Sequence, residues 1–271
     1  MGSFKIDQQR INNLIETSRM AGEAIMKVYK TDFNIQIKKD SSPVTEADLA
    51  SHEIITSNLK KLTPNIPVIS EESCRIPLHE RAKWGEYWLI DPLDGTKEFI
   101  KKNDEFTTNI ALLRNNKPVL GIIHVPAYDE TYWGSENLGS YELCGDSQSD
   151  AKEMRVSSDS DSKLRIVSSR SHPSGDLKIL LDRLKEYELV SIGSSLKFCL
   201  VAKGEADCYP RLGPTSEWDT AAGEAIARFS GAMIVDLKNQ NLCYNSRKDF
   251  LNPYFIVSNN ISNKEKILSL L

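Results

Sequence analysis

Two aspartates that lie close together in the sequence, Asp91 and Asp94, are the residues best suited to metal chemistry. They follow residues 87–90, an apolar run typical of a short buried strand, which we expect to stop at Asp91. Pro92 keeps Asp91 extended and Gly95 permits a turn, so both carboxylates should lie at the mouth of a sheet. At ~4 Å they would repel by about 4 kcal/mol at an effective dielectric of about 20. A hard divalent cation such as Mg²⁺, which prefers oxygen ligands, would offset this repulsion.

The same motif has a purely structural alternative, in which Asp-Gly is a polar turn and the first aspartate caps a helix. The longer string, residues 91–99, is more specific and reads Asp-Pro-Leu-Asp-Gly-Thr-Lys-Glu-Phe. Its first part resembles the signature of the inositol monophosphatase superfamily, whose members include Mg²⁺-dependent, lithium-sensitive phosphatases. Its continuation as Lys-Glu-Phe resembles the 3'(2'),5'-bisphosphate nucleotidases of the CysQ type within that superfamily.

Two further acidic motifs lie in the order that this resemblance implies. Glu71 and Glu72 follow the apolar residues 67–69 and Ser70, and such a pair after a strand is ordinarily a solvated loop. Asp219 opens a helical pattern, where an aspartate is ordinarily an N-cap. The Ser-Glu-Glu and Trp-Asp-x-Ala-Ala-Gly strings resemble two blocks of the superfamily. The resemblance implies that Glu71 and Asp219 are metal ligands.

Thr45 and Asp48 form an approximate capping box before a predicted helix that ends near Leu62. Spacing alone favours a structural role for both residues. The superfamily carries a Thr-x-x-Asp at this point, and its aspartate orients the catalytic threonine. The resemblance therefore implies that Asp48 supports Thr96, and that Glu71, Thr96 and Asp48 form the catalytic set.

The carboxylates of Glu71, Asp91, Asp94 and Asp219 carry four negative charges, which two Mg²⁺ ions would balance. A third, weaker ion is expected once phosphate is bound. The resemblance implies five metal ligands: Glu71, Asp91, the backbone carbonyl of Leu93, Asp94 and Asp219. The expected reaction is direct in-line attack of a metal-activated water on a phosphate monoester, without a phosphorylated enzyme. The Gly95-Thr96 turn should begin a helix whose N–H groups can bind phosphate oxygens.

Substrate contacts are less specific in the sequence. Lys197 and Arg211 could neutralise a second phosphate, Arg211 by a bidentate fork, although either alone is more often a solvated charge. The strings Gly-Ser-Ser-Leu-Lys, Tyr-x-Arg and Ser-Arg-Ser-His resemble segments of the nucleotidases, the last with its histidine, His172, near the base. The implied substrate contacts are Asp94, Gly95, Thr96, His172, Ser194, Ser195, Lys197, Arg211 and Asp219.

The implied activity is removal of the 3'-phosphate from adenosine 3',5'-bisphosphate (PAP), a by-product of sulfate assimilation, with its sulfated analogue PAPS as a further substrate. Two alternatives stay open. One is an inositol or sugar-phosphate phosphatase. The other is a nucleotide-binding regulator that lost turnover, which the complete set of acids and Thr96 disfavours.

Apolar periodicity supports a mixed α/β (α+β) fold. It predicts helices over residues 6–30, 177–184 and 196–202, a hairpin over 106–124, and strands over 33–37, 154–156, 164–168, 189–192, 206–209 and 254–258. The resemblance implies a layered α-β-α-β-α sandwich of the inositol monophosphatase and fructose-1,6-bisphosphatase type. We expect an N-terminal α+β lobe, residues 1–155, with most metal ligands. A C-terminal α/β lobe, residues 156–271, should carry Asp219 and the nucleotide contacts.

Bulk properties describe an ordinary globular protein. A net charge of −4 over 271 residues gives no support for binding nucleic-acid polymers. Five cysteines without C-x-x-C spacing favour a reducing compartment and neither zinc nor disulfides. No apolar run reaches the ~18 residues of a membrane span. We expect a cytoplasmic protein; the oligomeric state and peripheral contact with the inner membrane stay open.

Overall fold

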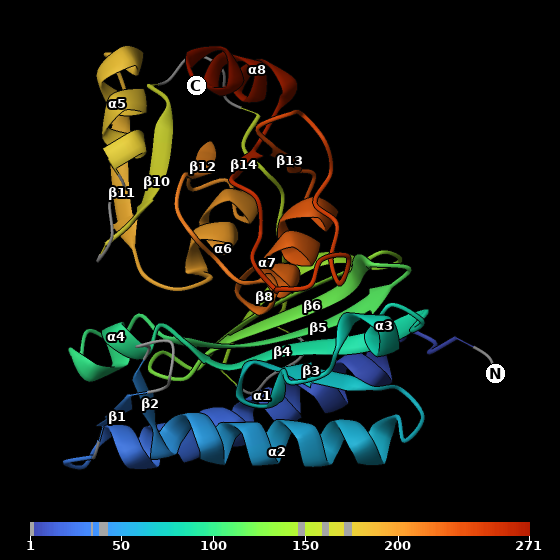
Figure 1. The fold of residues 1–271 in the computed structure, drawn as a ribbon. Coiled ribbons are helices and arrows are strands. Elements are labelled where there is room, and N and C mark those ends of the chain that lie inside the picture. Colours follow the sequence, from blue (N-terminus) through green and yellow to red (C-terminus); the bar gives the residue numbers. More distant parts are fainter. Residues whose placement is uncertain (1–2, 34, 38–42, 146–149, 159–162, 171–174) are drawn as a thin grey trace.

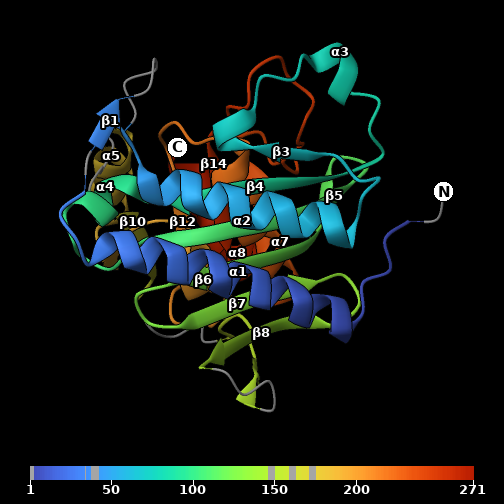
Figure 2. The ribbon, with the colours of Figure 1, turned by 90° about the horizontal axis from the view of Figure 1, so that it is seen from below.

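The computed structural model describes residues 3–33, 35–37, 43–145, 150–158, 163–170 and 175–271. In this part of the chain, helices and sheets alternate in five layers (Figure 1). Helices α1 (Gln8–Tyr29) and α2 (Glu46–Leu62) lie across the outer face of a seven-stranded sheet, as Figure 2 shows from below. Helices α6 (Leu196–Ala202) and α7 (Glu217–Phe229) separate this sheet from a five-stranded one. Helices α5 (Gly175–Leu184) and α8 (Ile261–Leu270) cover the far side, which completes the expected α-β-α-β-α sandwich.

The seven-stranded sheet is antiparallel except for its first pair, β3 and β4, which are parallel. Its strands, in spatial order, are β3 (Val68–Ser70), β4 (Glu86–Asp94), β5 (Thr107–Arg114), β6 (Lys117–Val125), β7 (Glu130–Ser135), β8 (Gly139–Cys144) and β9 (Lys152–Glu153). The predicted hairpin is β5–β6. Its turn residues Asn115 and Asn116 both have positive φ, 50° and 61°, as a type I′ hairpin turn requires.

The five-stranded sheet is mixed, in the order β11-β10-β12-β14-β13. Its strands are β10 (Arg165–Ser169), β11 (Glu188–Ile192), β12 (Cys208–Arg211), β13 (Met233–Asp236) and β14 (Phe255–Ser258). A separate small ribbon joins β1 (Ile35–Ile37) to β2 (Pro43–Thr45). Strand β10 is parallel to β11 and β12, which agrees with the alternating strand and helix pattern in this part of the sequence.

Helix α7 approaches the larger sheet closely enough that only glycine fits beneath it. A Cβ on Gly121 in β6 would lie 2.2 Å from the Ala222 carbonyl oxygen, and one on Gly134 in β7 would lie 2.7 Å from Ile226 Cα. Glycine within a strand commonly marks such a close backbone approach. These contacts hold the N-terminal turn of α7, with Asp219, over the ends of β4 and β5.

Three predictions of local structure were wrong. Strand β4 does not stop at Asp91 but continues to Asp94, because pairing with β5 resumes after a bulge. The short strand expected over residues 154–156 lies at Lys152–Glu153 instead, paired with β8. Strand β12 begins at Cys208, two residues later than predicted. No helix among the described residues combines the length and apolar content needed to cross a bilayer.

Candidate active site

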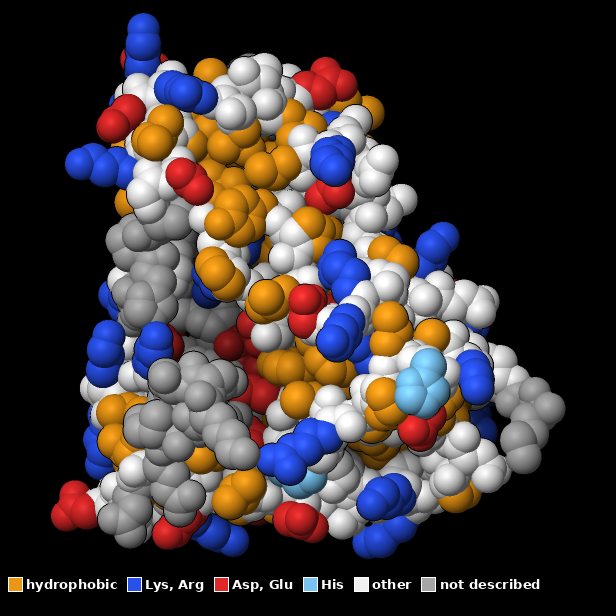
Figure 3. Space-filling model, viewed as in Figure 1, with side chains coloured by type: hydrophobic (Ala, Val, Ile, Leu, Met, Phe, Trp, Pro, Cys, Tyr) orange, Lys and Arg blue, Asp and Glu red, His pale blue; other side chains and the backbone are white. Residues whose placement is uncertain are grey.

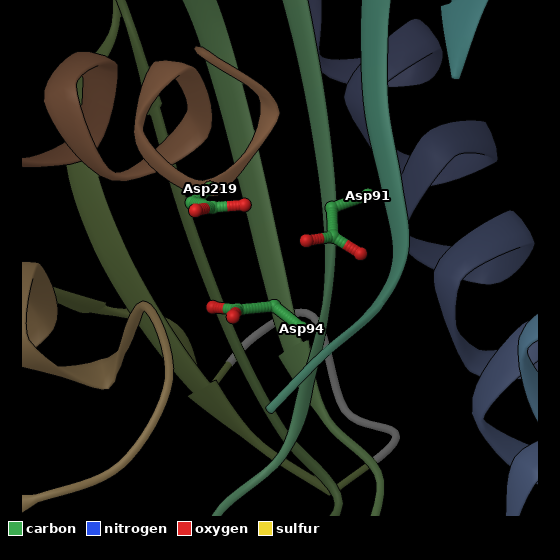
Figure 4. Close-up of side chains that lie close together, drawn as sticks. All are labelled: Asp91, Asp94 and Asp219. Atoms are coloured by element: carbon green, nitrogen blue, oxygen red, sulfur yellow. The ribbon is translucent and has the colours of Figure 1, made fainter. Parts of the chain in front are cut away.

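Three aspartates from two distant parts of the chain converge at the ends of β4 and α7. One carboxylate oxygen each from Asp91, Asp94 and Asp219 lies within 4.8 Å of the other two, and Figure 4 shows the three side chains facing a common point. Asp219 is the third residue of α7, where its Oδ2 accepts a hydrogen bond from the Ser216 N–H (2.9 Å) in a capping box. The structural and functional interpretations of Asp219 therefore coexist.

Each aspartate is oriented by the protein through one oxygen. Asp91 Oδ1 accepts from the Leu93 N–H across the bulge (3.0 Å), and Asp94 Oδ2 accepts from the Ser194 hydroxyl (2.7 Å). Among the described residues, hydrogen bonds engage only one oxygen of Asp91, Asp94 and Asp219. The second oxygen of each is available to a ligand.

The electrostatics of this cluster favour the binding of a cation. Burial raises the pKa of Asp91 well above its usual range, and the nearby charges of Glu71 and Asp94 add to the effect. Burial, then Asp94 and Glu71, raise the pKa of Asp219 to about 8. Carboxylates crowded without compensating charge behave in this way, and a bound divalent cation reverses the effect. An all-oxygen set is the type of site that Mg²⁺, Ca²⁺ or Mn²⁺ occupies.

Glu71 lies near the aspartates but outside the group of mutually close oxygens. It begins the short 3₁₀ helix η1 (Glu71–Ser73) directly after β3, and its side chain is half-buried. The Ser70 hydroxyl caps this helix by accepting from the Glu72 N–H (3.3 Å), and it is paired with His52 Nδ1 at 2.8 Å. The charge of Glu71 still acts on the pKa values of Asp91 and Asp219.

Thr96 and Asp48 lie next to each other, as the sequence led us to expect. Thr96 begins helix α4 (Thr96–Ile100) after Gly95, whose φ of 87° favours glycine. Its Oγ1 lies 3.4 Å from both Asp48 Oδ1 and the Leu93 carbonyl oxygen, a long distance for a hydrogen bond. The predicted capping box is present, with Asp48 Oδ2 accepting from the N–H and hydroxyl of Thr45 at 2.7 Å each.

A cavity of about 130 Å³ opens beside Asp94 and Asp219. Seven of the implied substrate contacts line it: Asp94, Gly95, Ser194, Ser195, Lys197, Arg211 and Asp219. Thr96 is not a lining residue, and His172 lies outside the described residues. Figure 3 shows acidic side chains inside a hollow on this face of the molecule. A larger hollow of about 680 Å³, beside the N-terminal segment, shares no residue with the candidate site.

Six further residues line the smaller cavity that were not assigned from the sequence: Glu98, Ser169, Phe198, Tyr209, Thr215 and Thr220. Three of them belong to strings that pointed to the nucleotidases: Glu98 to Lys-Glu-Phe, Ser169 to Ser-Arg-Ser and Tyr209 to Tyr-x-Arg. Nothing in the local sequence around the others distinguishes them from residues of an ordinary helix or loop.

The cavity combines its acidic side with two cations. Lys197 is buried; its Nζ donates to the Ser194 carbonyl (2.5 Å) and lies 5.7 Å from the centre of the Tyr209 ring. Burial lowers the pKa of Lys197 to about 8, a change that Asp94 opposes and Arg211 reinforces. The Arg211 guanidinium donates to the carbonyls of Gly213 and Pro214. An anion bound between the aspartates and these two residues would be attracted by the positive charges of Lys197 and Arg211.

Comparison with known proteins agrees with this geometry. The model of the inositol monophosphatase family matches residues 7–271. The 3'(2'),5'-bisphosphate nucleotidase CysQ of Escherichia coli K12 is 47% identical over 251 residues, which cover 92% of this chain and 99% of that protein. The CysQ of Haemophilus influenzae is 38% identical, with 93% of each chain covered.

Solved structures extend the likeness to three dimensions. The crystal structure of CysQ from Bacteroides thetaiotaomicron, described as a bacterial member of the inositol monophosphatase family, superposes with a TM-score of 0.82 at 39% identity. The match covers 94% of this chain and 98% of that one. An IMPase from Thermotoga maritima superposes with a TM-score of 0.79 at 25% identity, with 97% of each chain covered.

Proposed function

Because the chain belongs to the inositol monophosphatase family, we propose that it is a CysQ-type 3'(2'),5'-bisphosphate nucleotidase that hydrolyses PAP to AMP and phosphate and also accepts PAPS. The observation that carries the proposal is the position of the three aspartates beside a cavity that also holds Lys197 and Arg211. A bisphosphate needs both features, a cation site for the reacting phosphate and fixed positive charge for the other phosphate.

We propose that two to three Mg²⁺ ions bind to Glu71, Asp91, the Leu93 carbonyl, Asp94 and Asp219. The oxygen ligands, their unshared second oxygens and the raised carboxylate pKa values support this assignment. When bound, the ions supply Lewis-acid activation of water and of the phosphate.

The proposed roles of the protein groups follow from their positions. Asp48 accepts a hydrogen bond from the Thr96 hydroxyl, so that the Thr96 oxygen faces the water as an acceptor. Glu71 holds the same water from the η1 side. The water oxygen gives up one proton and forms a bond to phosphorus while the bond from phosphorus to the ribose 3'-oxygen breaks, and the leaving oxygen takes up one proton, so that one water is consumed. The phosphoryl group passes directly to water.

For the remainder of the substrate, we propose that Lys197 and Arg211 bind the 5'-phosphate and that Ser194 and Ser195 line its path. The buried ammonium of Lys197 supports this role, because desolvated charge interacts strongly with an anion. His172 remains the proposed neighbour of the adenine base. We also propose a division between residues 1–155, with most metal ligands, and residues 156–271, with Asp219 and the nucleotide contacts.

The test compares phosphate release from PAP and from inositol 1-phosphate at saturating Mg²⁺. We expect kcat/KM for the bisphosphate to exceed that for inositol 1-phosphate by at least about a hundredfold, because a second charged subsite contributes several kcal/mol. Chelation of Mg²⁺ should abolish the activity. A preference for inositol 1-phosphate would favour the sugar-phosphate alternative, and tight nucleotide binding without hydrolysis would identify a regulator.

A further inference from the structure

Glu105 lies between the two loops that form the site. It occupies the connection from α4 to β5, and it is almost fully buried. Its carbonyl oxygen would lie 3.0 Å from a Cβ on Gly95, in the loop that carries Asp94. The same oxygen would lie 2.9 Å from a Cβ on Gly193, in the loop that carries Ser194. The two loops therefore pack against one residue, and both need glycine at the point of contact.

The Glu105 carboxylate binds the second of these loops directly. Its Oε2 accepts from the Gly193 N–H at 2.7 Å. The same carboxylate receives a two-point fork from Arg170, with Nε to Oε2 at 2.8 Å and Nη2 to Oε1 at 2.6 Å. Arg170 also donates from Nη2 to the carbonyl of Ser191 (3.0 Å), at the end of β11. Charge-assisted, two-point contacts of this kind fix geometry as well as adding free energy.

The loop held in this way forms one wall of the cavity and contacts a metal ligand. Ser194 has a φ of 54°, in the left-handed region, and its hydroxyl donates to Asp94. The hydroxyls of Ser194 and Ser195 lie 2.6 Å and 2.8 Å from the Thr107 hydroxyl. A residue in a sparsely populated conformation persists only where its surroundings hold it there. Glu105 and Arg170 supply part of that restraint from outside the cavity.

We propose that Glu105 is a positioning residue that, together with Arg170, sets the affinity for the nucleotide by fixing the loop 193–195. The inference rests on the proposed function for the identity of the substrate. Glu105 does not line the cavity, so it acts through the loop. Backbone N–H groups next to β4 and α7 orient Asp91 and Asp219, and only Asp94 is also contacted by the loop, through Ser194. The chemical step should therefore depend less on Glu105 than substrate binding does.

Two variants each remove one part of the contact between Glu105 and Arg170. Glu105→Gln keeps an oxygen that can accept from the Gly193 N–H but removes the charge that binds Arg170. Arg170→Lys keeps the charge but removes the fork. Glu86→Gln is the matched control, because Glu86 is similarly buried and binds Arg114 through two nitrogens, at the edge of the molecule away from the site.

We expect Glu105→Gln and Arg170→Lys each to raise KM for PAP by about tenfold while kcat changes by less than about twofold. The double variant should be no worse than the poorer single variant, since both remove the same interaction. Glu86→Gln should match the wild type. An unchanged KM in Glu105→Gln, or a fall in kcat at constant KM, would overturn the proposal.

A second measurement needs no substrate. Hydrogen exchange in Glu105→Ala should be faster in the peptide that contains residues 193–195 and unchanged in the peptide that contains residues 86–90. If the wild type fails to hydrolyse PAP, the proposed function is wrong, and this exchange measurement still decides whether Glu105 holds the loop. Equal exchange in variant and wild type would refute the positioning role.

Discussion

Each aspartate of the cluster has two functions at the scale of the residue. One oxygen of Asp91, Asp94 or Asp219 makes a hydrogen bond that fixes the side chain, and the three carboxylates lie close to one another. Ligands that are oriented before the metal arrives lose less conformational entropy on binding it. Burial, and after it the crowding of negative charge, raises the pKa values of Asp91 and Asp219.

Asp94→Asn should separate catalysis from folding. Loss of one carboxylate removes a metal ligand and weakens Lewis-acid activation, so kcat should fall by about 10³ or more. The amide is close in shape, and it relieves repulsion in the metal-free cluster. Thermal unfolding without metal should therefore occur at the same or a higher temperature than in the wild type. A variant that unfolds at a lower temperature than the wild type and keeps its kcat would contradict both expectations.

Titration of Lys197 should make the substrate affinity depend on pH. Its pKa of about 8 in the folded protein lies below the ordinary value, so the ammonium loses its proton as the pH rises through 8. At saturating Mg²⁺, KM for PAP should increase between pH 7 and pH 9, since the neutral amine attracts the 5'-phosphate less. The lowered pKa also sets the direction in which stability changes with pH. Burial of charged Lys197 costs folding free energy below pH 8, and this cost disappears as the pH approaches 10.5.

Lys197→Arg is the control for this prediction. The guanidinium stays charged throughout the range, so the part of the pH dependence that Lys197 causes should disappear even if the absolute KM changes. A KM that is constant from pH 7 to pH 9 in the wild type would show that Lys197 does not bind the phosphate in its charged form.

At the scale of the element, the bulge in β4 and the close packing of α7 against the seven-stranded sheet bring the aspartates together. The bulge places one extra residue between Asp91 and Asp94 relative to β5, so that both side chains reach the same side of the site. The sequence predicted the strand and the helix but not their relation. Gly121 and Gly134 within predicted strands are compatible with a close backbone approach, but nothing near them in the sequence identifies α7, about a hundred residues later, as the element that approaches.

Gly121→Ala should test the packing of α7. The new methyl group would meet the Ala222 carbonyl, so the helix must move away from the sheet. We expect a loss of about 1–3 kcal/mol in unfolding free energy, together with weaker Mg²⁺ binding because Asp219 moves with the helix. Gly85→Ala is the matched control, since a Cβ there meets nothing within 4 Å. Urea unfolding and calorimetric Mg²⁺ titration of both variants give the comparison. Equal stability of the two would contradict the packing argument.

At the scale of the whole molecule, the layer order and most elements could be predicted from apolar periodicity and the resemblance. Helix α6 was predicted at its observed bounds, and α1, α2 and the β5–β6 hairpin were predicted within a few residues. Strand β13 was not given bounds from the sequence, because its four residues, 233–236, are too short an apolar run to be told from the end of a helix by periodicity alone. The meeting of Asp219 with Asp91 and Asp94 could not be read from spacing. It depends on the packing of α7 against the seven-stranded sheet, and it was predicted only from the resemblance.

Cations bound at the proposed site should also stabilise the fold, because the proposed ligands come from β4 and α7. At a free Mg²⁺ concentration a hundred times the dissociation constant, linkage gives about 2.7 kcal/mol for one site. The thermal midpoint should therefore rise with Mg²⁺ and fall with a chelator. Asp219→Asn should lose most of this shift. A shift that is the same in this variant would mean that the ions bind elsewhere.

The most direct test of the account is a crystal structure with Mn²⁺ and AMP plus phosphate, in which anomalous scattering locates the ions. We predict at least one ion bound jointly by Asp91, Asp94 and Asp219, with oxygen distances of about 2.0–2.4 Å, and phosphate bound to it on the side of Thr96. Anomalous density only at other positions, or an Asp219 carboxylate that does not share an ion with Asp91 and Asp94, would contradict it.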